Sequence, residues 1–326
     1  MSYFCIHGLG LAGSTVAWQL WQRGIPFSII DHGQGGSSRV AAGLIQPITG
    51  KNATLTWEYD VFFKEAENFY RGIEITVAQK FWYPLESIRL VPPHAEKKLL
   101  PKLLATSHAP YVIGEIDSPW TGMRAIAIRG SARLDVAAFV NATREFFAEK
   151  GYLIPPFSPQ ENDTTPILCE GAEGLMLHHP QVWPHRCAKG EILTVHAPSW
   201  QQTRLISGGA WLVPIGNDCY KIGATYEWHE VDEVITAEGF AWLTRAAQNL
   251  GGADFTILDH QAGIRPIVRK SMPIIGKIPQ SNHIVFNGLG SKGSLYAPGC
   301  AKQLIDFLIH DSPIQPELDA AKYFSV

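Results

Sequence analysis

A glycine motif of the form G-x-G-x-x-G near the N-terminus constrains the fold of this chain more than any other feature of the sequence. An apolar, strand-like segment (residues 3–7) precedes the motif, and a segment with apolar residues at helical spacing follows it. The next apolar segment, residues 27–30, ends at Asp31. This order predicts a Rossmann-type unit that binds a dinucleotide, with the pyrophosphate on the helix N-terminus. The three glycines are Gly8, Gly10 and Gly13.

Each residue of this unit has an expected role. Gly8 permits the tight turn, Gly10 lets the backbone approach the pyrophosphate, and Gly13 lets the helix pack closely on the strand. Asp31 is expected to accept hydrogen bonds from the adenosine ribose, and its charge disfavours NADP. A glycine turn in another α/β fold is the competing interpretation. The agreement of strand, helix and acidic residue favours the dinucleotide, but the motif does not choose between FAD and NAD.

Composition limits the other classes of function. The chain has 326 residues, which suits two domains, and a net charge of −3, which gives no long-range attraction for nucleic acid or anionic membranes. Its five cysteines are an odd number without a C-x-x-C pair, so we expect reduced thiols in a cytoplasmic protein. No membrane span is expected, because no run of roughly 18 apolar residues occurs. Histidines 178, 179 and 185 lack a completing ligand set, so no metal site is predicted.

The remainder of the sequence alternates between segments with a helical pattern and segments with a strand or loop pattern. Asp135 and Thr236 are expected N-caps of two helices, and a helical pattern runs from residue 57 to about 72. Residues 33–50 are expected to form a functional loop, because they are rich in glycine and serine. Short strands are expected between residues 190 and 225, and a closing helix runs to about residue 309.

Several further motifs follow one another in a fixed order along nearly the whole chain. Together with residues 8–31, the segments in question are residues 37–43 (SSRVAAG), 169–172 (CEGA), 189–192 (KGEI), 211–214 (WLVP), 222–226 (IGATY), 262–266 (AGIRP), 273–276 (PIIG) and 288–293 (GLGSKG). This succession resembles the D-amino-acid oxidase/glycine oxidase (DAO) family of FAD-dependent oxidoreductases. Residues 43–51 (GLIQPITGK) depart from its best-known members, so the substrate does not carry over.

The resemblance implies the fold and the cofactor. It implies an α/β fold with a discontinuous, Rossmann-like FAD-binding domain (residues 1–75, 125–185 and 252–326) and a substrate domain with a mainly antiparallel sheet plus helices (76–124 and 186–251). It also implies that residues 288–293 lie under the flavin pyrimidine ring. The expected cofactor-binding residues are Gly8, Gly10, Gly13, Asp31, Ser37, Ser38, Gly43, Gly171, Gly288, Gly290, Ser291, Lys292 and Gly293.

Four side chains are candidates for the chemistry. By resemblance, Arg265 binds a substrate carboxylate, which a planar guanidinium can hold in a bidentate manner; the alternative is an ion pair with a protein carboxylate. Lys292 would stabilise the negative charge of the reduced flavin, or it is a surface lysine in a turn. Trp211 and Tyr226 are candidate pocket walls, with core packing equally open.

The expected reaction is oxidation of a small amine or amino acid by hydride transfer from Cα to flavin N5. Because only one dinucleotide motif occurs, electrons are expected to enter from the substrate and leave to oxygen, a quinone or another protein. Two alternatives stay open. One is FAD-dependent demodification of a tRNA wobble uridine, which the net charge does not encourage. The other is a flavin-binding electron-transfer subunit without its own substrate.

Overall fold

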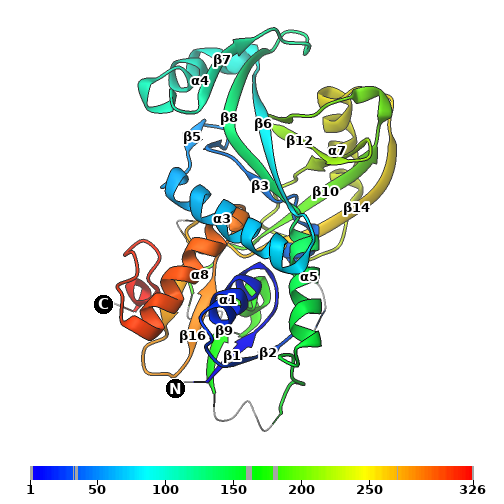
Figure 1. Ribbon diagram of the computed structural model, residues 1–326. Coiled ribbons are helices and arrows are strands. Elements are labelled where there is room, and N and C mark those ends of the chain that lie inside the picture. The colour runs from blue at the N-terminus through cyan, green and yellow to red at the C-terminus, as the bar shows by residue number, and fades with distance from the viewer. Residues whose placement is uncertain are drawn as a thin grey trace.

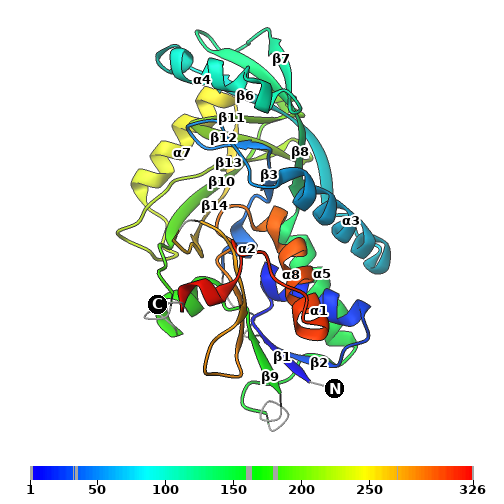
Figure 2. The same ribbon diagram turned by 90° about the vertical axis from the view of Figure 1, so that its left-hand side faces the viewer.

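Two β-sheets organise the protein. The computed structural model describes residues 3–31, 33, 36–158, 164–178, 183–269 and 271–324. It contains a five-stranded sheet, a nine-stranded sheet and a two-stranded hairpin. The large sheet lies at one end of the molecule and the five-stranded sheet at the other (Figures 1 and 2). His179, one of the three histidines considered for a metal site, lies outside the described residues.

The five-stranded sheet has the order β15-β16-β9-β1-β2. Four of its strands are parallel, and β15 pairs with β16 in the antiparallel direction. All four residues of β2 are buried, as expected for a strand of a parallel sheet covered on both faces. The strands are β1 (Phe4–His7), β2 (Phe27–Ile30), β9 (Thr165–Leu168), β15 (Ile274–Lys277) and β16 (Ile284–Asn287).

Helices from distant parts of the sequence pack together beside this sheet. Residues 11–20 of α1 are all buried, because α1 lies between the sheet and the helices α5 and α8. The indole Nε1 of Trp18 donates a hydrogen bond to the Thr143 hydroxyl on α5 at 2.8 Å. In α3, buried side chains recur at helical spacing and face α8. The helices are α1 (Leu11–Gln22), α3 (Tyr59–Val77), α5 (Val136–Glu149) and α8 (Gly293–His310).

The large sheet has the order β14-β10-β13-β12-β11-β6-β8-β3, with β7 paired to β8. Every neighbouring pair is antiparallel except β6 and β11, so the expected mainly antiparallel sheet is confirmed. Helix α7 (Ala237–Leu250) packs on one face, against β10, β12 and β13. The strands are β3 (Leu44–Ile45), β6 (Trp82–Val91), β7 (Val112–Ile116), β8 (Arg124–Leu134), β10 (Ala188–His196), β11 (Leu205–Gly208), β12 (Ala210–Gly216), β13 (Cys219–Gly223) and β14 (Thr256–Arg265).

Shorter elements complete the fold. Helix α4 packs near the β4–β5 hairpin at the outer end of the large sheet, where their apolar side chains share one buried cluster. The remaining elements are α2 (Ser37–Val40), β4 (Ile48–Thr49), β5 (Thr54–Leu55), α4 (Glu96–Leu103), α6 (Gly171–Glu173), a π-helical turn (Gly174–His178) and short 3₁₀ turns at Pro93–Ala95, Thr106–His108, Pro198–Trp200 and Ala320–Tyr323.

Both predicted helix caps are confirmed. The Asp135 carboxylate accepts a hydrogen bond from the Ala138 amide at 3.1 Å, and the Thr236 hydroxyl accepts one from the Gly239 amide at 2.9 Å. The helix expected over residues 57–72 is α3, which continues to residue 77. The segment expected as a loop, residues 33–50, contains α2 and the short strands β3 and β4.

The predicted domain ranges do not coincide with the two sheets at every strand. Strands β8 and β14 fall in ranges assigned to the FAD-binding domain, yet they hydrogen-bond to β6 and β10 in the large sheet. The reason is that the chain forms a full strand of the large sheet before it returns to the five-stranded sheet. The division into two domains stays a prediction.

Candidate functional site

The predicted cofactor-binding residues gather at one edge of the five-stranded sheet. Gly8 follows β1, Asp31 follows β2, Gly171 follows β9 and Gly288 follows β16. Because these four strands are parallel, all four residues lie at the carboxyl edge, where open α/β sheets bind their ligands. The Asn287 amide nitrogen donates to the Gly171 carbonyl at 2.9 Å and so joins two of these turns.

The first turn depends on two of its glycines. Gly8 has a φ of +92°, a conformation that side chains rarely adopt. A Cβ atom at Gly13 would overlap the carbonyl oxygen of Gly8, so only glycine lets α1 approach β1 this closely. Gly10 is the N-cap of α1 and has no side chain with which to cap the helix itself. The geometry of Gly8 and Gly13 is consistent with the turn of a dinucleotide-binding motif.

Asp31 is held by two partners. One carboxylate oxygen accepts a hydrogen bond from the Leu9 amide at 3.1 Å, and the other forms an ion pair with Arg144 of α5. Arg144 also packs beside Gly33. Arg144 was not predicted as a partner, because it lies 113 positions from Asp31 in the chain. Asp31 is therefore fixed in position beside the first turn.

Helix α2 brings a serine to the start of α1. The Leu11 amide donates a hydrogen bond to the Ser38 hydroxyl at 3.0 Å. Ser37 lies against β14, where a Cβ atom at Gly263 would be 3.4 Å from its Cα. Gly43 has a φ of +68°, and a Cβ there would overlap the Leu134 carbonyl. The predicted residues of this segment thus connect the first turn to the large sheet.

The second glycine loop joins β16 to α8. The Gly290 amide donates to the Pro266 carbonyl at 3.0 Å, which ties the loop to the chain just after Arg265. Lys292 is the N-cap of α8, and no side chain caps this helix. A Cβ atom at Gly293 would be 3.0 Å from the Leu11 side chain, so the N-termini of α8 and α1 are neighbours. Two helix dipoles therefore present their positive ends in one region.

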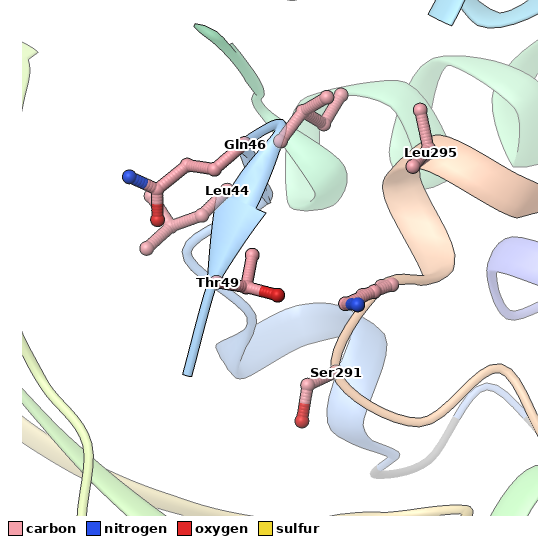
Figure 3. Close-up of a pocket in the computed structure, with 7 residues that line it drawn as sticks. Leu44, Gln46, Thr49, Ser291 and Leu295 are labelled. Carbon is pink, nitrogen blue, oxygen red and sulfur yellow. The ribbon is translucent and has the colours of Figure 1, made fainter. Parts of the chain in front are cut away.

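A cavity of about 140 Å³ lies beside Lys292. Figure 3 shows Thr49 and Ser291 on opposite sides of this cavity, on the β4 segment and on the loop before α8. Burial lowers the pKa of Lys292, and among the described residues no carboxylate pairs with it. The sequence did not single out the apolar lining. The lining residues are Leu44, Ile45, Gln46, Thr49, Ser291, Lys292 and Leu295.

Arg265, at the end of β14, has no carboxylate partner among the residues that the structure describes. Its guanidinium donates to the carbonyls of Lys189 (3.0 Å) and Thr225 (3.3 Å) and stacks 4.6 Å from the Tyr226 ring centroid. A Cβ atom at Gly190 would overlap the guanidinium, so this glycine makes room for it. Burial lowers the pKa of Arg265. The predicted alternative, an ion pair with a protein carboxylate, is not what the structure shows.

Trp211 lies in a similar arrangement on the same sheet. A Cβ atom at Gly223 would overlap its indole, so the ring lies across the neighbouring strand β13. Trp211 packs in a cluster with Leu44, which lines the cavity beside Lys292. Tyr226 is 44% exposed and pairs with Trp228 at the surface. Trp211, Tyr226 and Arg265 do not themselves line that cavity.

The donor set suits a dinucleotide with a flavin at its far end. A helix N-terminus, a glycine turn and a carboxylate meet at the first turn, as an ADP group requires. A second helix N-terminus lies next to it, with the ammonium group of Lys292, which has no carboxylate partner among the described residues, so further negative charge is stabilised there. The residues present therefore fit FAD. None of the described helices is both long and apolar enough to span a membrane.

Comparison with known proteins agrees with this geometry. The fold is similar to glycine oxidase from Geobacillus kaustophilus (TM-score 0.82, 18% identity, covering 99% of this chain and 98% of that one). It is also similar to iminodiacetate oxidase from Chelativorans sp. BNC1 (TM-score 0.79, 18% identity, covering 97% of this chain and 98% of that one). A third similar structure is L-proline dehydrogenase from P. horikoshii (TM-score 0.77, 15% identity, covering 99% of this chain and 98% of that one). Residues 159–307 match the family model DAO, described as FAD dependent oxidoreductase. Residues 159–307 are therefore similar to the FAD-dependent oxidoreductases of the DAO family, and this similarity together with the residues of the site indicates FAD as the cofactor.

Proposed function

We propose that this protein oxidises the C–N bond of a small amine or amino acid whose carboxylate binds Arg265. The observation that carries this proposal is the state of the Arg265 guanidinium. It is largely buried, it is oriented by two backbone carbonyls and one aromatic ring, and among the described residues it has no carboxylate partner. A buried cation with free N–H groups is a favourable partner for a ligand carboxylate.

The position of Arg265 supports the same proposal. The glycine loop that begins α8 is hydrogen-bonded to Pro266, so Arg265 lies directly beside the predicted flavin site. Three of the solved structures with this fold carry names of enzymes that act on glycine, iminodiacetate or L-proline. Each of these compounds has both an amine and a carboxylate.

The chain's own residues would bind and orient the substrate. When bound, FAD accepts the hydride from the substrate Cα, and the resulting imine is hydrolysed by water. Arg265 would fix the carboxylate and thereby the direction of the Cα–H bond, with Tyr226 holding one face of the guanidinium. Trp211 would form an apolar wall. We assign no side-chain base, because a substrate that binds with a neutral amine has no proton to lose before hydride transfer.

Anaerobic mixing tests the proposal. The purified holoenzyme would be mixed with amino acids and N-alkyl glycines, and the flavin absorbance near its visible maximum recorded. We expect at least one compound with both an amine and a carboxylate to bleach the flavin, and the corresponding amine without a carboxylate to fail. No bleaching by any compound would contradict the proposal. Admitting oxygen, a quinone or a protein acceptor afterwards identifies the electron acceptor.

Gly190→Ala tests the position of Arg265 without removing the arginine. The added Cβ overlaps the guanidinium, which must move from its two carbonyl partners. We expect kcat/KM for a carboxylate substrate to fall by about 10- to 100-fold, because small displacements of orienting groups are costly. Steady-state kinetics with FAD content as the reference measure this. Gly72→Ala is the control, since a Cβ at Gly72 meets nothing within 4 Å. Equal kinetics for both variants would disprove the role.

Lys292→Met tests the electrostatic role proposed for this lysine. Removing a buried cation from the uncapped end of α8 removes positive charge where we place the flavin pyrimidine ring. We expect bound FAD with a reduction potential lowered by about 30–60 mV, measured by a dye-coupled redox titration. Lys302→Met is the matched control, because Lys302 lies on the exposed side of the same helix and pairs with Glu65. An unchanged potential in Lys292→Met would remove the assignment.

A further inference from the structure

Arg265 is the inner end of a row of stacked side chains that reaches the surface. Its guanidinium lies 4.6 Å from the Tyr226 ring centroid, and that ring lies 4.6 Å from the Trp228 ring. The guanidinium of Arg186 lies 4.9 Å from the Trp228 ring. Both aromatic rings are nearly half exposed, at 44% and 45%. The row therefore fixes a second arginine at a defined place beyond the proposed substrate site.

Arg186 also lines a second cavity, of about 390 Å³. The cavity is built on paired backbone segments: the Arg186 amide donates to the Ile267 carbonyl at 2.7 Å, and the Arg269 amide donates to the Pro184 carbonyl at 2.8 Å. Each of its four polar lining residues has a side chain that can donate hydrogen bonds. The lining residues are His185, Arg186, Ile267, Val268, Arg269 and Ser271.

The cations of this cavity are not neutralised by the described part of the chain. No described carboxylate lies within ion-pair distance of Arg186 or Arg269. Two acidic side chains close to Trp228 in the sequence have other partners: Glu227 accepts hydrogen bonds from the Trp228 and His229 amides, and Asp232 pairs with Lys189. Arg186 and Arg269 thus line one cavity as exposed cations that have no carboxylate partner in the described part of the chain, so both are available to an anion.

We propose that this cavity binds a phosphate group. Two arginines, an imidazole and a hydroxyl approach it from separate chain segments, and a tetrahedral oxyanion can accept from several directions at once. The volume exceeds that of a free phosphate, so an organic group attached to the phosphate also fits. The phosphate belongs either to the distal end of the amine substrate or to a separate small ligand. The cavity shares no lining residue with the first glycine turn, where we place the FAD pyrophosphate.

Equilibrium dialysis of FAD-saturated holoenzyme against radiolabelled inorganic phosphate tests the site. We expect one saturable site per chain and a dissociation constant raised about tenfold in Arg186→Met and in Arg269→Met. Trp228→Leu removes the ring that orients Arg186 and should raise the dissociation constant for phosphate about threefold. Arg245→Met, an exposed arginine of α7, is the matched control and should leave binding unchanged.

Two results would overturn the proposal: the absence of saturable binding by the holoenzyme, or equal binding by Arg186→Met and Arg245→Met. Because dialysis involves no turnover, either result leaves the proposed oxidation untouched. The source of the phosphate follows from the kinetics of amine oxidation. If inorganic phosphate raises KM without lowering kcat, the site takes the distal phosphate of the substrate. If KM is unchanged while binding is saturable, the site takes a separate phosphate ligand.

Discussion

Arg265→Met is expected to lower kcat/KM for a carboxylate-bearing amine by roughly 10²- to 10³-fold while the protein keeps its full content of FAD. Removing one partner from a buried, hydrogen-bonded charge pair costs about 2–5 kcal/mol, and each 1.4 kcal/mol corresponds to about a factor of ten. The guanidinium donates to the carbonyls of Lys189 and Thr225, packs on the ring of Tyr226 and lies beside Gly190, so methionine removes contacts with the large sheet and its flanking residues and none with the first glycine turn. Steady-state kinetics and the flavin absorbance measure the two quantities.

Two comparisons make this result specific. Arg265→Lys keeps the charge but loses the planar, bidentate geometry. We therefore expect its kcat/KM for a carboxylate-bearing amine to lie between the values for the wild type and Arg265→Met. An amine substrate without a carboxylate should be oxidised equally by the wild type and by Arg265→Met. If the loss is the same for substrates with and without a carboxylate, Arg265 supports the structure of the site and does not bind the substrate.

Gly13→Ala is expected to yield a colourless, destabilised protein. The added Cβ overlaps the Gly8 carbonyl oxygen, and a backbone atom cannot rotate out of the way as a side chain can. Helix α1 must therefore move away from β1, which opens the turn on which the pyrophosphate lies. We expect the free energy of unfolding to fall by about 3 kcal/mol, the upper end of the usual cost of overpacking, because the overlap is with the backbone. Absorbance of the purified protein and urea unfolding of the apoprotein measure the two effects.

Gly72→Ala is the matched control for this substitution. Gly72 lies inside α3, and a Cβ atom there meets nothing within 4 Å. Alanine in an exposed helix interior is more favourable than glycine by about 0.5–1 kcal/mol, so the same chemical change should stabilise the protein slightly. A yellow, normally stable Gly13→Ala protein would show that the first turn does not bind the cofactor in the way we assign.

The features predicted correctly from the sequence are those with local physical causes. The caps at Asp135 and Thr236 bind amides three residues away, and the first glycine turn is specified within a few residues. Strand β6 was not predicted, although it is ten residues long. It carries Pro84 and Arg89, and it is buried because it pairs with β8, a strand more than thirty residues further along the chain.

The candidate site shows the same limit. Motif position singled out Arg265 and Lys292, and the structure places them on segments joined by the hydrogen bond from the Gly290 amide to the Pro266 carbonyl. Their functional roles stay predictions. The functional importance of Gly190 could not be read from its neighbours, since it depends on a guanidinium from β14 on the adjacent strand. The partner of Asp31 was missed for the same reason, because Arg144 reaches it from α5. Long-range pairing decides which of several arginines has no partner.

The contact between the beginnings of α1 and α8 has a consequence for biosynthesis. The two helix ends lie near opposite ends of the described chain, yet Gly293 packs against Leu11. A ribosome-bound chain that has exposed only the first Rossmann segment lacks the loop and helix that meet the other end of the flavin. Complete FAD capture must therefore follow synthesis of α8, nearly three hundred residues after the first glycine turn.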